Sequence, residues 1–202
     1  MSIERKIVIF TQRVETIASY GERRDEADQN ISRLFSECGY IPVPVANNPA
    51  LADEYVQRLA PSGIVLTGGN DLVKYGGNAP ERDEMERRLI GIAIERDIPL
   101  YGFCRGMQMI LDYFGCGLVR VEGHVAVHHK IRGEISRSVN SYHNLGCRDI
   151  GDAPLDVLAR TSDGVIEAVR AQSKKIIGTM WHPERETPFD KMDKELIRFL
   201  FG

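Results

Sequence analysis

The sequence predicts an α/β fold in which one open sheet is covered by helices on both faces. In the first half of the 202-residue chain, short apolar runs alternate with stretches of helical periodicity. This alternation indicates βαβ units, whose crossover helices make the strands parallel. After Gly117 the apolar runs become short and β-like, which predicts antiparallel strands that extend the same sheet. We therefore expect one domain over residues 1–202.

The first half contains four expected strands and four expected helices. The strands are Lys6–Phe10, Tyr40–Val45, Ile64–Leu66 and Pro99–Phe103, and the helices are Arg24–Cys38, Pro49–Leu59, Glu81–Arg96 and Met107–Phe114. Gly39 is expected to end the first helix, because glycine readily adopts the left-handed conformation found there. The prolines of Tyr40–Val45 predict an edge strand, since proline has no N–H to donate to a neighbour.

The second half is expected to add six strands and a final helix. The strands are Leu118–Val121, Val125–Arg132, Val139–Tyr142, Asp156–Arg160, Val165–Arg170 and Ile176–Met180. Turn residues such as Asp163-Gly164 separate several of them, as in antiparallel hairpins. The helix Phe189–Phe201 closes the chain.

Composition and charge restrict the class of protein. With 43% hydrophobic and 27% charged residues, the chain has the composition of a globular domain. The formal net charge of -3 indicates no basic surface for nucleic acid or for an anionic membrane. No apolar run approaches the roughly 18 residues that indicate a membrane span. Because the first residues also lack a signal-peptide pattern, we expect a cytoplasmic protein.

Four cysteines with irregular spacing favour free thiols over a disulfide framework. They are Cys38, Cys104, Cys116 and Cys147. A chain of this length can be stable without disulfides, so a reducing compartment is the expected setting. A cysteine in an unusual local sequence is then a candidate for chemistry.

Cys104 lies in the most distinctive motif of the chain. The segment Gly102-Phe103-Cys104-Arg105-Gly106 joins a strand to a helix with the glycine-x-nucleophile-x-glycine spacing of a nucleophile elbow. Glycine is needed at both ends because larger side chains would collide with the strand and the helix. A helix N-terminus favours a thiolate, and the N–H of Arg105 can face an oxyanion. For this motif alone, a buried structural cysteine is the alternative.

His182 and Glu184 are the expected base and its orienting group. They follow a strand within Trp181-His182-Pro183-Glu184. A thiol needs a base to accept its proton, and the base needs a third group that holds its tautomer. Residues i and i+2 share one face of an extended segment, so the carboxylate can reach the imidazole. A surface histidine is the alternative for this motif alone.

Two glycines mark a third candidate segment, Thr67-Gly68-Gly69-Asn70-Asp71. Glycine lets the backbone approach a ligand closely and offer an N–H to it. Considered alone, the segment is better explained as a plain turn. All three motifs, however, follow the carboxyl ends of strands, where open α/β sheets bind ligands. Their agreement predicts an active site with a cysteine nucleophile.

Three motifs follow one another along the chain: Thr-Gly-Gly, Gly-Phe-Cys-Arg-Gly-Met-Gln and Trp-His-Pro-Glu. In this order, over about residues 64–185, they resemble the motifs of class I glutamine amidotransferases. The resemblance implies a flavodoxin-like open mixed sheet flanked by helices, in agreement with the expected elements. It also implies hydrolysis of a γ-glutamyl amide without a cofactor. Cys104 would form a glutamyl thioester, and His182, oriented by Glu184, would transfer the protons.

The same resemblance implies roles for residues around this triad. Gly69 and Arg105 match the backbone donors of the oxyanion hole. The implied substrate-binding residues are Gln108, Asn70, Tyr142, His143 and Asn144. The last three belong to Asn140-Ser141-Tyr142-His143-Asn144, whose sequence departs from the family pattern.

Three histidines lie outside these motifs. His124, His128 and His129 could form a metal site, but no cysteine or carboxylate pattern accompanies them. Acyl transfer by a cysteine needs no Lewis acid. We therefore expect no metal site, and positions on strands or loops for these histidines.

Several segments favour the stand-alone γ-glutamyl hydrolases within the family. The chain has no room for the synthase that fused amidotransferases carry. The segments are Thr11-Gln12-Arg13, Ser19-Tyr20, Glu22-Arg23-Arg24 and Asn140–Asn144. Together with Gly68–Asp71 and Gly115-Cys116-Gly117, they resemble the γ-glutamyl-CDP-amidate hydrolases of capsule phosphoramidate synthesis. Arg13, Arg23 or Arg24 would then face phosphates, although a solvated charge run better explains the last two.

Two other functions stay open. One is a glutaminase subunit that passes ammonia to a separate synthase, and the other is a non-catalytic γ-glutamyl-binding module. The intact triad argues against the second, because a binder needs neither His182 nor Glu184. The expected partner is a small-molecule γ-glutamyl amide, with no nucleic acid and no membrane. A homo-oligomer stays open, and a synthase partner is expected only for the glutaminase subunit.

Overall fold

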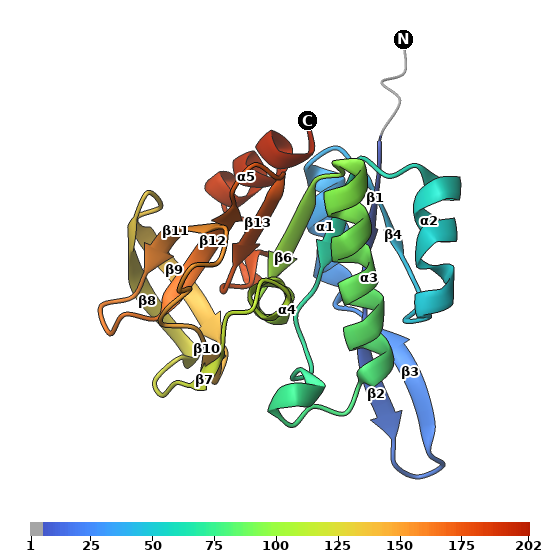
Figure 1. Ribbon diagram of the computed structural model, residues 1–202, viewed down its shortest axis with the longest axis horizontal. Coiled ribbons are helices and arrows are strands. Elements are labelled where there is room, and N and C mark those ends of the chain that lie inside the picture. Colours follow the sequence, from blue (N-terminus) through green and yellow to red (C-terminus); the bar gives the residue numbers. More distant parts are fainter. Residues whose placement is uncertain (1–5) are drawn as a thin grey trace.

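The computed structural model describes residues 6–202, and its centre is a nine-stranded mixed sheet (Figure 1). The strand order is β4-β1-β5-β6-β13-β12-β11-β8-β9. The parallel part consists of β4 (Ile41–Pro44), β1 (Ile7–Phe10), β5 (Gly63–Leu66), β6 (Leu100–Phe103) and β13 (Ile176–Thr179). The antiparallel part consists of β12 (Ile166–Ala171), β11 (Leu155–Arg160), β8 (Val125–Gly133) and β9 (Arg137–Tyr142). The predicted fold class is confirmed.

Helices cover both faces of the parallel strands, whose residues are apolar on both sides. One face carries α2 (Ala52–Leu59), α3 (Pro80–Arg96) and α4 (Arg105–Tyr113), which share a core with Ile9 of β1. The opposite face carries α1 (Gln29–Glu37) and α5 (Lys191–Phe201), which share a core with Val8 and Phe10. Short 3-10 turns lie at Pro49–Leu51, Val73–Tyr75 and Pro183–Arg185.

The segment between β1 and α1 is a hairpin that the sequence did not predict. β2 (Arg13–Ile17) and β3 (Glu22–Glu26) are antiparallel and extend away from the sheet (Figure 1). The expected helix over Arg24–Cys38 is therefore wrong at its start. The helix begins at Gln29, where the side chain of Asp28 accepts a hydrogen bond from the backbone N–H of Asn30 at 2.8 Å. β3 reads Glu-Arg-Arg-Asp-Glu, so it carries no apolar alternation that could reveal it.

The second half differs from the expected antiparallel arrangement in two places. β7 (Val119–Arg120) pairs with β10 (Leu145–Gly146) in a separate two-stranded sheet, so the expected strand Leu118–Val121 does not extend the main sheet. β13 returns to the middle of the sheet, antiparallel to β12 but parallel to β6. This return makes β5, β6 and β13 direct neighbours with their carboxyl ends at one edge.

Three further expectations can be compared with the structure. β4 lies at the edge of the sheet, as its prolines predicted. All four cysteines are free and buried. Within residues 6–202, none of the helices combines the length and the apolar character required to cross a membrane.

Candidate active site

Cys104 connects β6 to α4 through a strained backbone. Its φ of 51° and ψ of -109° lie in a region that residues other than glycine rarely adopt. The backbone N–H of Cys104 donates to the carbonyl oxygen of Thr179 at 2.8 Å, which ties this turn to the end of β13. A structural cysteine needs no such strain. The geometry is that of a nucleophile elbow.

The glycines on either side of Cys104 are required by crowding, as the sequence predicted. A Cβ on Gly106 would lie 2.0 Å from the carbonyl oxygen of Leu66 in the neighbouring strand. A Cβ on Gly102 would lie 2.6 Å from Cδ1 of Ile110 and 2.7 Å from the backbone of Gly106. The turn can therefore form only where both positions lack a side chain.

His182 and Glu184 form a buried pair beside this elbow. Nδ1 of His182 lies 2.6 Å from Oε1 of Glu184, and the two residues are 3% and 2% exposed. Burial alone would lower the pKa of His182. The charge of the Cys104 thiolate, the hydrogen bond between Cys104 and His182, and the Glu184 carboxylate outweigh it and raise the pKa to about 9. The three predicted triad residues therefore lie together, and their contacts favour a protonated His182.

The position of the His182 ring is fixed from several sides. The side chain of Asn140 accepts a hydrogen bond from the backbone N–H of His182 at 2.9 Å and donates one to its carbonyl oxygen at 2.9 Å. The rings of Phe103 and Tyr142 meet the imidazole edge to face, with centroids 5.8 and 5.7 Å away. A Cβ on Gly68 would lie 2.7 Å from Cε1 of His182. The segment Thr67–Asp71, called the glycine loop below, therefore packs directly on the ring.

The predicted oxyanion donors lie on two segments beside the triad, the start of α4 and the loop that packs on His182. Arg105 is the first residue of α4, so its backbone N–H has no acceptor within the helix. Gly69 adopts a φ of 87° in the loop after β5. Both positions satisfy the backbone requirements of an oxyanion hole. Their contact with substrate stays a prediction.

Arg82 stabilises the glycine loop through hydrogen bonds to its backbone. The sequence did not predict this role. Its buried guanidinium donates hydrogen bonds to the carbonyl oxygens of Thr67 at 2.6 Å, of Gly68 at 3.1 Å and of Gly69. In a trans peptide the N–H points opposite to the C=O. Because the Gly68 carbonyl faces Arg82, the N–H of Gly69 points away from Arg82. This is the orientation that an oxyanion donor at Gly69 requires.

A buried ionic network supports Arg82 and connects the loop to α4. Glu86 accepts hydrogen bonds from Arg82 at 2.9 Å, from the hydroxyl of Thr11 at 2.8 Å and from the guanidinium of Arg105. Asp83 also pairs with Arg105. Burial, with the nearby charge of Arg105, lowers the pKa of Arg82 to about 10. The side chain of Arg105 is therefore structural, and only its backbone N–H is left for the predicted oxyanion hole.

The predicted substrate-binding residues are distributed unequally around the triad. The side chain of Gln108 is buried and donates to the carbonyl oxygen of Leu145 at 3.0 Å. The amide of Asn70 is bonded to both backbone groups of Val14, at 2.8 and 2.9 Å, so it ties the loop to the hairpin. Tyr142 contacts the His182 ring.

His143 and Asn144 point in different directions. His143 is buried, and its Nε2 lies 3.3 Å from a carboxylate oxygen of Glu167. Asn144 is exposed, and its carbonyl oxygen accepts a hydrogen bond from the backbone N–H of Val121. A role in substrate binding stays a prediction for both.

The three remaining histidines separate in the structure. His128 is exposed on β8 and lies beside Glu186. His124 and His129 turn inward, and each has a ring nitrogen within 3.6 Å of a carboxylate oxygen of Glu167. The expected positions on a strand or loop are confirmed. The sequence argument that no carboxylate accompanies them is wrong, because β12 brings Glu167 to them.

Comparison with known proteins identifies the family of the chain. The family model for glutamine amidotransferase class-I matches residues 23–198. This chain belongs to the class I glutamine amidotransferase family. A γ-glutamyl-CDP-amidate hydrolase of Campylobacter jejuni subsp. jejuni serotype O:2 is 33% identical over 182 residues, which cover 88% of this chain and 89% of the relative. The family prediction is confirmed.

A second relative and a solved structure extend the comparison. A γ-glutamyl-γ-aminobutyrate hydrolase of Escherichia coli O157:H7 is 31% identical over 202 residues, covering 79% of this chain and 78% of the relative. The crystal structure of a Thermoplasma acidophilum protein assigned to GMP synthase superposes with a TM-score of 0.75 at 18% identity, covering 99% of this chain and 94% of that one. The first supports the prediction of an amide hydrolase, and the second shows the fold.

The pKa of His182 predicts the pH dependence of this class I amidotransferase. The raised pKa keeps His182 protonated up to about pH 9, so activity that needs an imidazolium should persist up to that pH. We expect kcat/KM to fall as the pH rises through about 9, because neutral His182 cannot protonate the leaving amine. Histidine-labelled NMR should show His182 titrating near the same pH in the wild type, and at lower pH in Cys104→Ala. A His182 signal that titrates alike in both proteins would contradict the ion pair.

Proposed function

We propose that this protein hydrolyses γ-glutamyl amides with a leaving group larger than ammonia, with γ-glutamyl-CDP-amidate as the preferred substrate. In that case it acts in capsule phosphoramidate synthesis and releases glutamate and a cytidine diphosphoramidate. The observation that carries the proposal is the β2–β3 hairpin, which brings Arg13 to the glycine loop beside His182. A Cβ on Gly69 would lie 3.0 Å from Cδ of Arg13. A relative named for hydrolysis of this substrate supports the choice.

The contacts among Cys104, His182 and Glu184 support the following reaction. The Cys104 thiolate attacks the γ-carbonyl carbon, and the oxyanion accepts hydrogen bonds from the N–H groups of Arg105 and Gly69. Protonated His182 donates its proton to the leaving amine, which leaves a glutamyl thioester and neutral imidazole. His182 then accepts a proton from water as the water attacks the thioester. Collapse of this second tetrahedral intermediate releases glutamate and restores the Cys104 thiolate.

Arg13 is the best-placed cation for a phosphate in the leaving group. It lines a small pocket with Gly69, His182 and Arg185. The acidic residues of this pocket are Glu26, Asp28 and Glu184. Within residues 6–202, its guanidinium has neither an ion pair nor a hydrogen bond to a side chain. A cation placed there favours a negatively charged leaving group.

Arg23 and Arg24, the other two candidates for phosphate contact, are already paired. Arg23 pairs with Glu81, and Nε of Arg24 lies 2.6 Å from Glu22. Both arginines are exposed at the far part of the hairpin. The solvated charge run expected from the sequence describes them better than a phosphate contact.

A set of kcat/KM values on the isolated protein tests the substrate. We expect kcat/KM to be higher for γ-glutamyl-CDP-amidate than for glutamine. Glutamine should have both a lower kcat and a higher KM, because it lacks the remote contacts. Folate-type, polyamine and γ-aminobutyrate conjugates of glutamate should lie between. If glutamine is the best substrate, or if all stay inert until a synthase is added, the protein is instead a glutaminase subunit.

A pair of arginine variants separates the phosphate contact from general damage. Arg13→Gln should lower kcat/KM for γ-glutamyl-CDP-amidate about 10- to 100-fold more than for γ-glutamyl-γ-aminobutyrate, the range expected for a hydrogen bond to a charged group. Arg24→Gln is the matched control, since Arg24 is exposed and paired with Glu22. Equal losses on both substrates in Arg13→Gln would remove phosphate recognition from this residue.

A further inference from the structure

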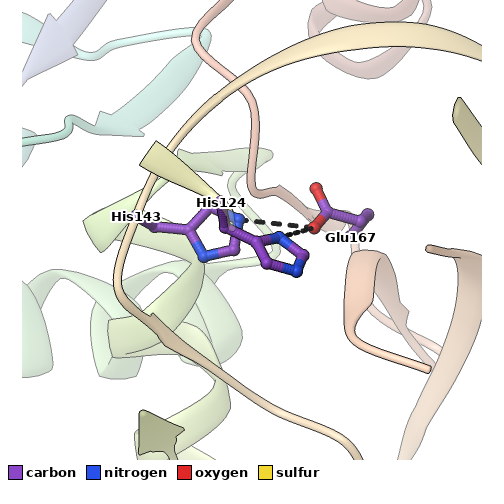
Figure 2. Close-up of side chains that lie close together, drawn as sticks. All are labelled: His124, His143 and Glu167. Atoms are coloured by element: carbon purple, nitrogen blue, oxygen red, sulfur yellow. Dashed lines mark ion pairs between the residues drawn. The ribbon is translucent and has the colours of Figure 1, made fainter. Parts of the chain in front are cut away.

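His124, His143 and Glu167 bring three potential metal ligands together outside the catalytic triad (Figure 2). One ring nitrogen or carboxylate oxygen from each residue lies within 4.8 Å of the others. The three residues come from separate segments: the turn before β8, the loop between β9 and β10, and β12. Their side chains are 4%, 1% and 0% exposed.

The second nitrogen of each histidine ring has a hydrogen-bond acceptor of its own. Nε2 of His124 lies 3.3 Å from Oδ2 of Asp163. Nδ1 of His143 lies 3.0 Å from the carbonyl oxygen of Leu145. Both oxygens only accept hydrogen bonds, so each neutral ring can donate its single proton to them. Nδ1 of His124 and Nε2 of His143 then present lone pairs.

Both lone pairs face the same carboxylate oxygen. Oε1 of Glu167 lies 3.6 Å from Nδ1 of His124 and 3.3 Å from Nε2 of His143, and Figure 2 shows the two rings turned toward it. Within the described part of the chain, none of these three atoms has a hydrogen-bond partner. Three buried acceptors that face one another are costly unless a cation lies between them.

The separations between these atoms also match those in a metal site. Zinc binds histidine nitrogen and carboxylate oxygen at about 2.0–2.2 Å. In a tetrahedron with such bonds, two ligand atoms are about 3.3–3.6 Å apart. The two observed separations, 3.3 and 3.6 Å, lie in this range.

We propose that Nδ1 of His124, Nε2 of His143 and Oε1 of Glu167 bind a divalent transition-metal ion such as zinc. Asp163 and the Leu145 carbonyl orient the two histidines, as outer residues do in histidine–zinc sites. A surface pocket of about 410 Å³, lined in part by His124, His129 and Asp163, gives access from solvent. His129 lies 3.4 Å from Oε2, the second oxygen of Glu167.

The ion connects segments that support the active site without entering its chemistry. Tyr142, which packs on the His182 ring, directly precedes the ligand His143. The backbone carbonyl of Glu167 accepts a hydrogen bond from the N–H of Met180, two residues before His182. The ion takes no part in the proposed reaction, and ligation of the metal replaces the substrate contact that the sequence implied for His143. It also reverses the expectation, drawn from the sequence, of a protein without metal.

A titration of the full-length Cys104→Ala protein tests the site, because the missing thiolate removes the competing ligand pair of Cys104 and His182. After treatment with a chelator, isothermal titration with Zn²⁺ should give one ion per chain and raise the melting temperature. Co²⁺ should give a visible spectrum of a nitrogen- and oxygen-ligated ion, without sulfur-to-cobalt charge transfer. No uptake of either ion, or a spectrum with sulfur ligands, would overturn the proposal.

Variants in the same Cys104→Ala background assign the ligands. His124→Gln and Glu167→Gln should weaken zinc binding more than about 100-fold, and Asp163→Asn about 10- to 100-fold, as outer residues do. His128→Gln is the matched control, since His128 is exposed and lies 3.3 Å from Glu186 instead. Zinc affinity that is unchanged in His124→Gln and Glu167→Gln would overturn the site. If Glu167→Gln fails to fold, His124→Gln and the stoichiometry of the parent protein still decide.

Discussion

Replacement of Cys104 by alanine should lower turnover by about six orders of magnitude while the fold stays intact. The loss of a nucleophile in a triad enzyme has an effect of roughly this size, because base and orienting group cannot act without it. The protein should still fold, since alanine is smaller than cysteine and leaves Gly102 and Gly106 in place. Glutamate release and thermal unfolding of Cys104→Ala measure the two effects separately.

Cys38 provides the matched control for this variant. Burial raises the pKa of the Cys38 thiol to about 11, so it stays protonated and inert near neutral pH. Cys38→Ala should therefore keep wild-type kcat, and a glutamine-like electrophile should label Cys104 but not Cys38. Turnover by Cys104→Ala within about tenfold of wild type would show that the nucleophile is wrongly assigned.

His182→Ala should lower kcat about 10⁶-fold, whereas Glu184→Gln should lower kcat about 10⁴-fold or less. His182 moves protons in both half-reactions, whereas Glu184 orients the ring through its 2.6 Å contact with Nδ1. Glutamine in place of Glu184 can still contact the ring but favours the wrong tautomer, so activity falls without vanishing.

His128→Gln serves as the control for the histidine substitution, since His128 is exposed and outside the triad. Its kcat should equal that of the wild type. Single-turnover rates of glutamate release compare the three variants on one substrate. A larger loss in Glu184→Gln than in His182→Ala would show that the roles of base and orienting group are reversed.

The triad could be predicted because its geometry depends on local spacing. Gly102 and Gly106 are required by contacts within one strand–turn–helix unit, and His182 and Glu184 are separated by a single residue. The alternation of elements then indicated that these segments share one sheet edge. The approach of Cys104 to His182, which are distant in the sequence, was expected from this alternation and from the family resemblance.

Features that depend on distant contacts could not be predicted. Arg82 and Glu86 lie within a highly charged helix, and only the glycine loop and α4 explain why both are fully buried. Glu167 reaches the histidines because β12 lies beside the turn and loop that carry His124 and His143. The β2–β3 hairpin was missed because β3 is charged throughout. It has no buried face, so its sequence lacks the alternation of apolar and polar residues that indicates a strand.

A glutamyl thioester on Cys104 is most directly detected by peptide mass spectrometry of protein quenched in acid during turnover of a γ-glutamyl amide. The peptide that contains Cys104 should gain the mass of one glutamyl group, and the same peptide of Cys104→Ala should gain nothing. The adduct should disappear when the substrate is exhausted, because water hydrolyses the thioester. Glutamate release at the wild-type rate by Cys104→Ala, or a glutamyl adduct on another residue, would contradict catalysis by Cys104.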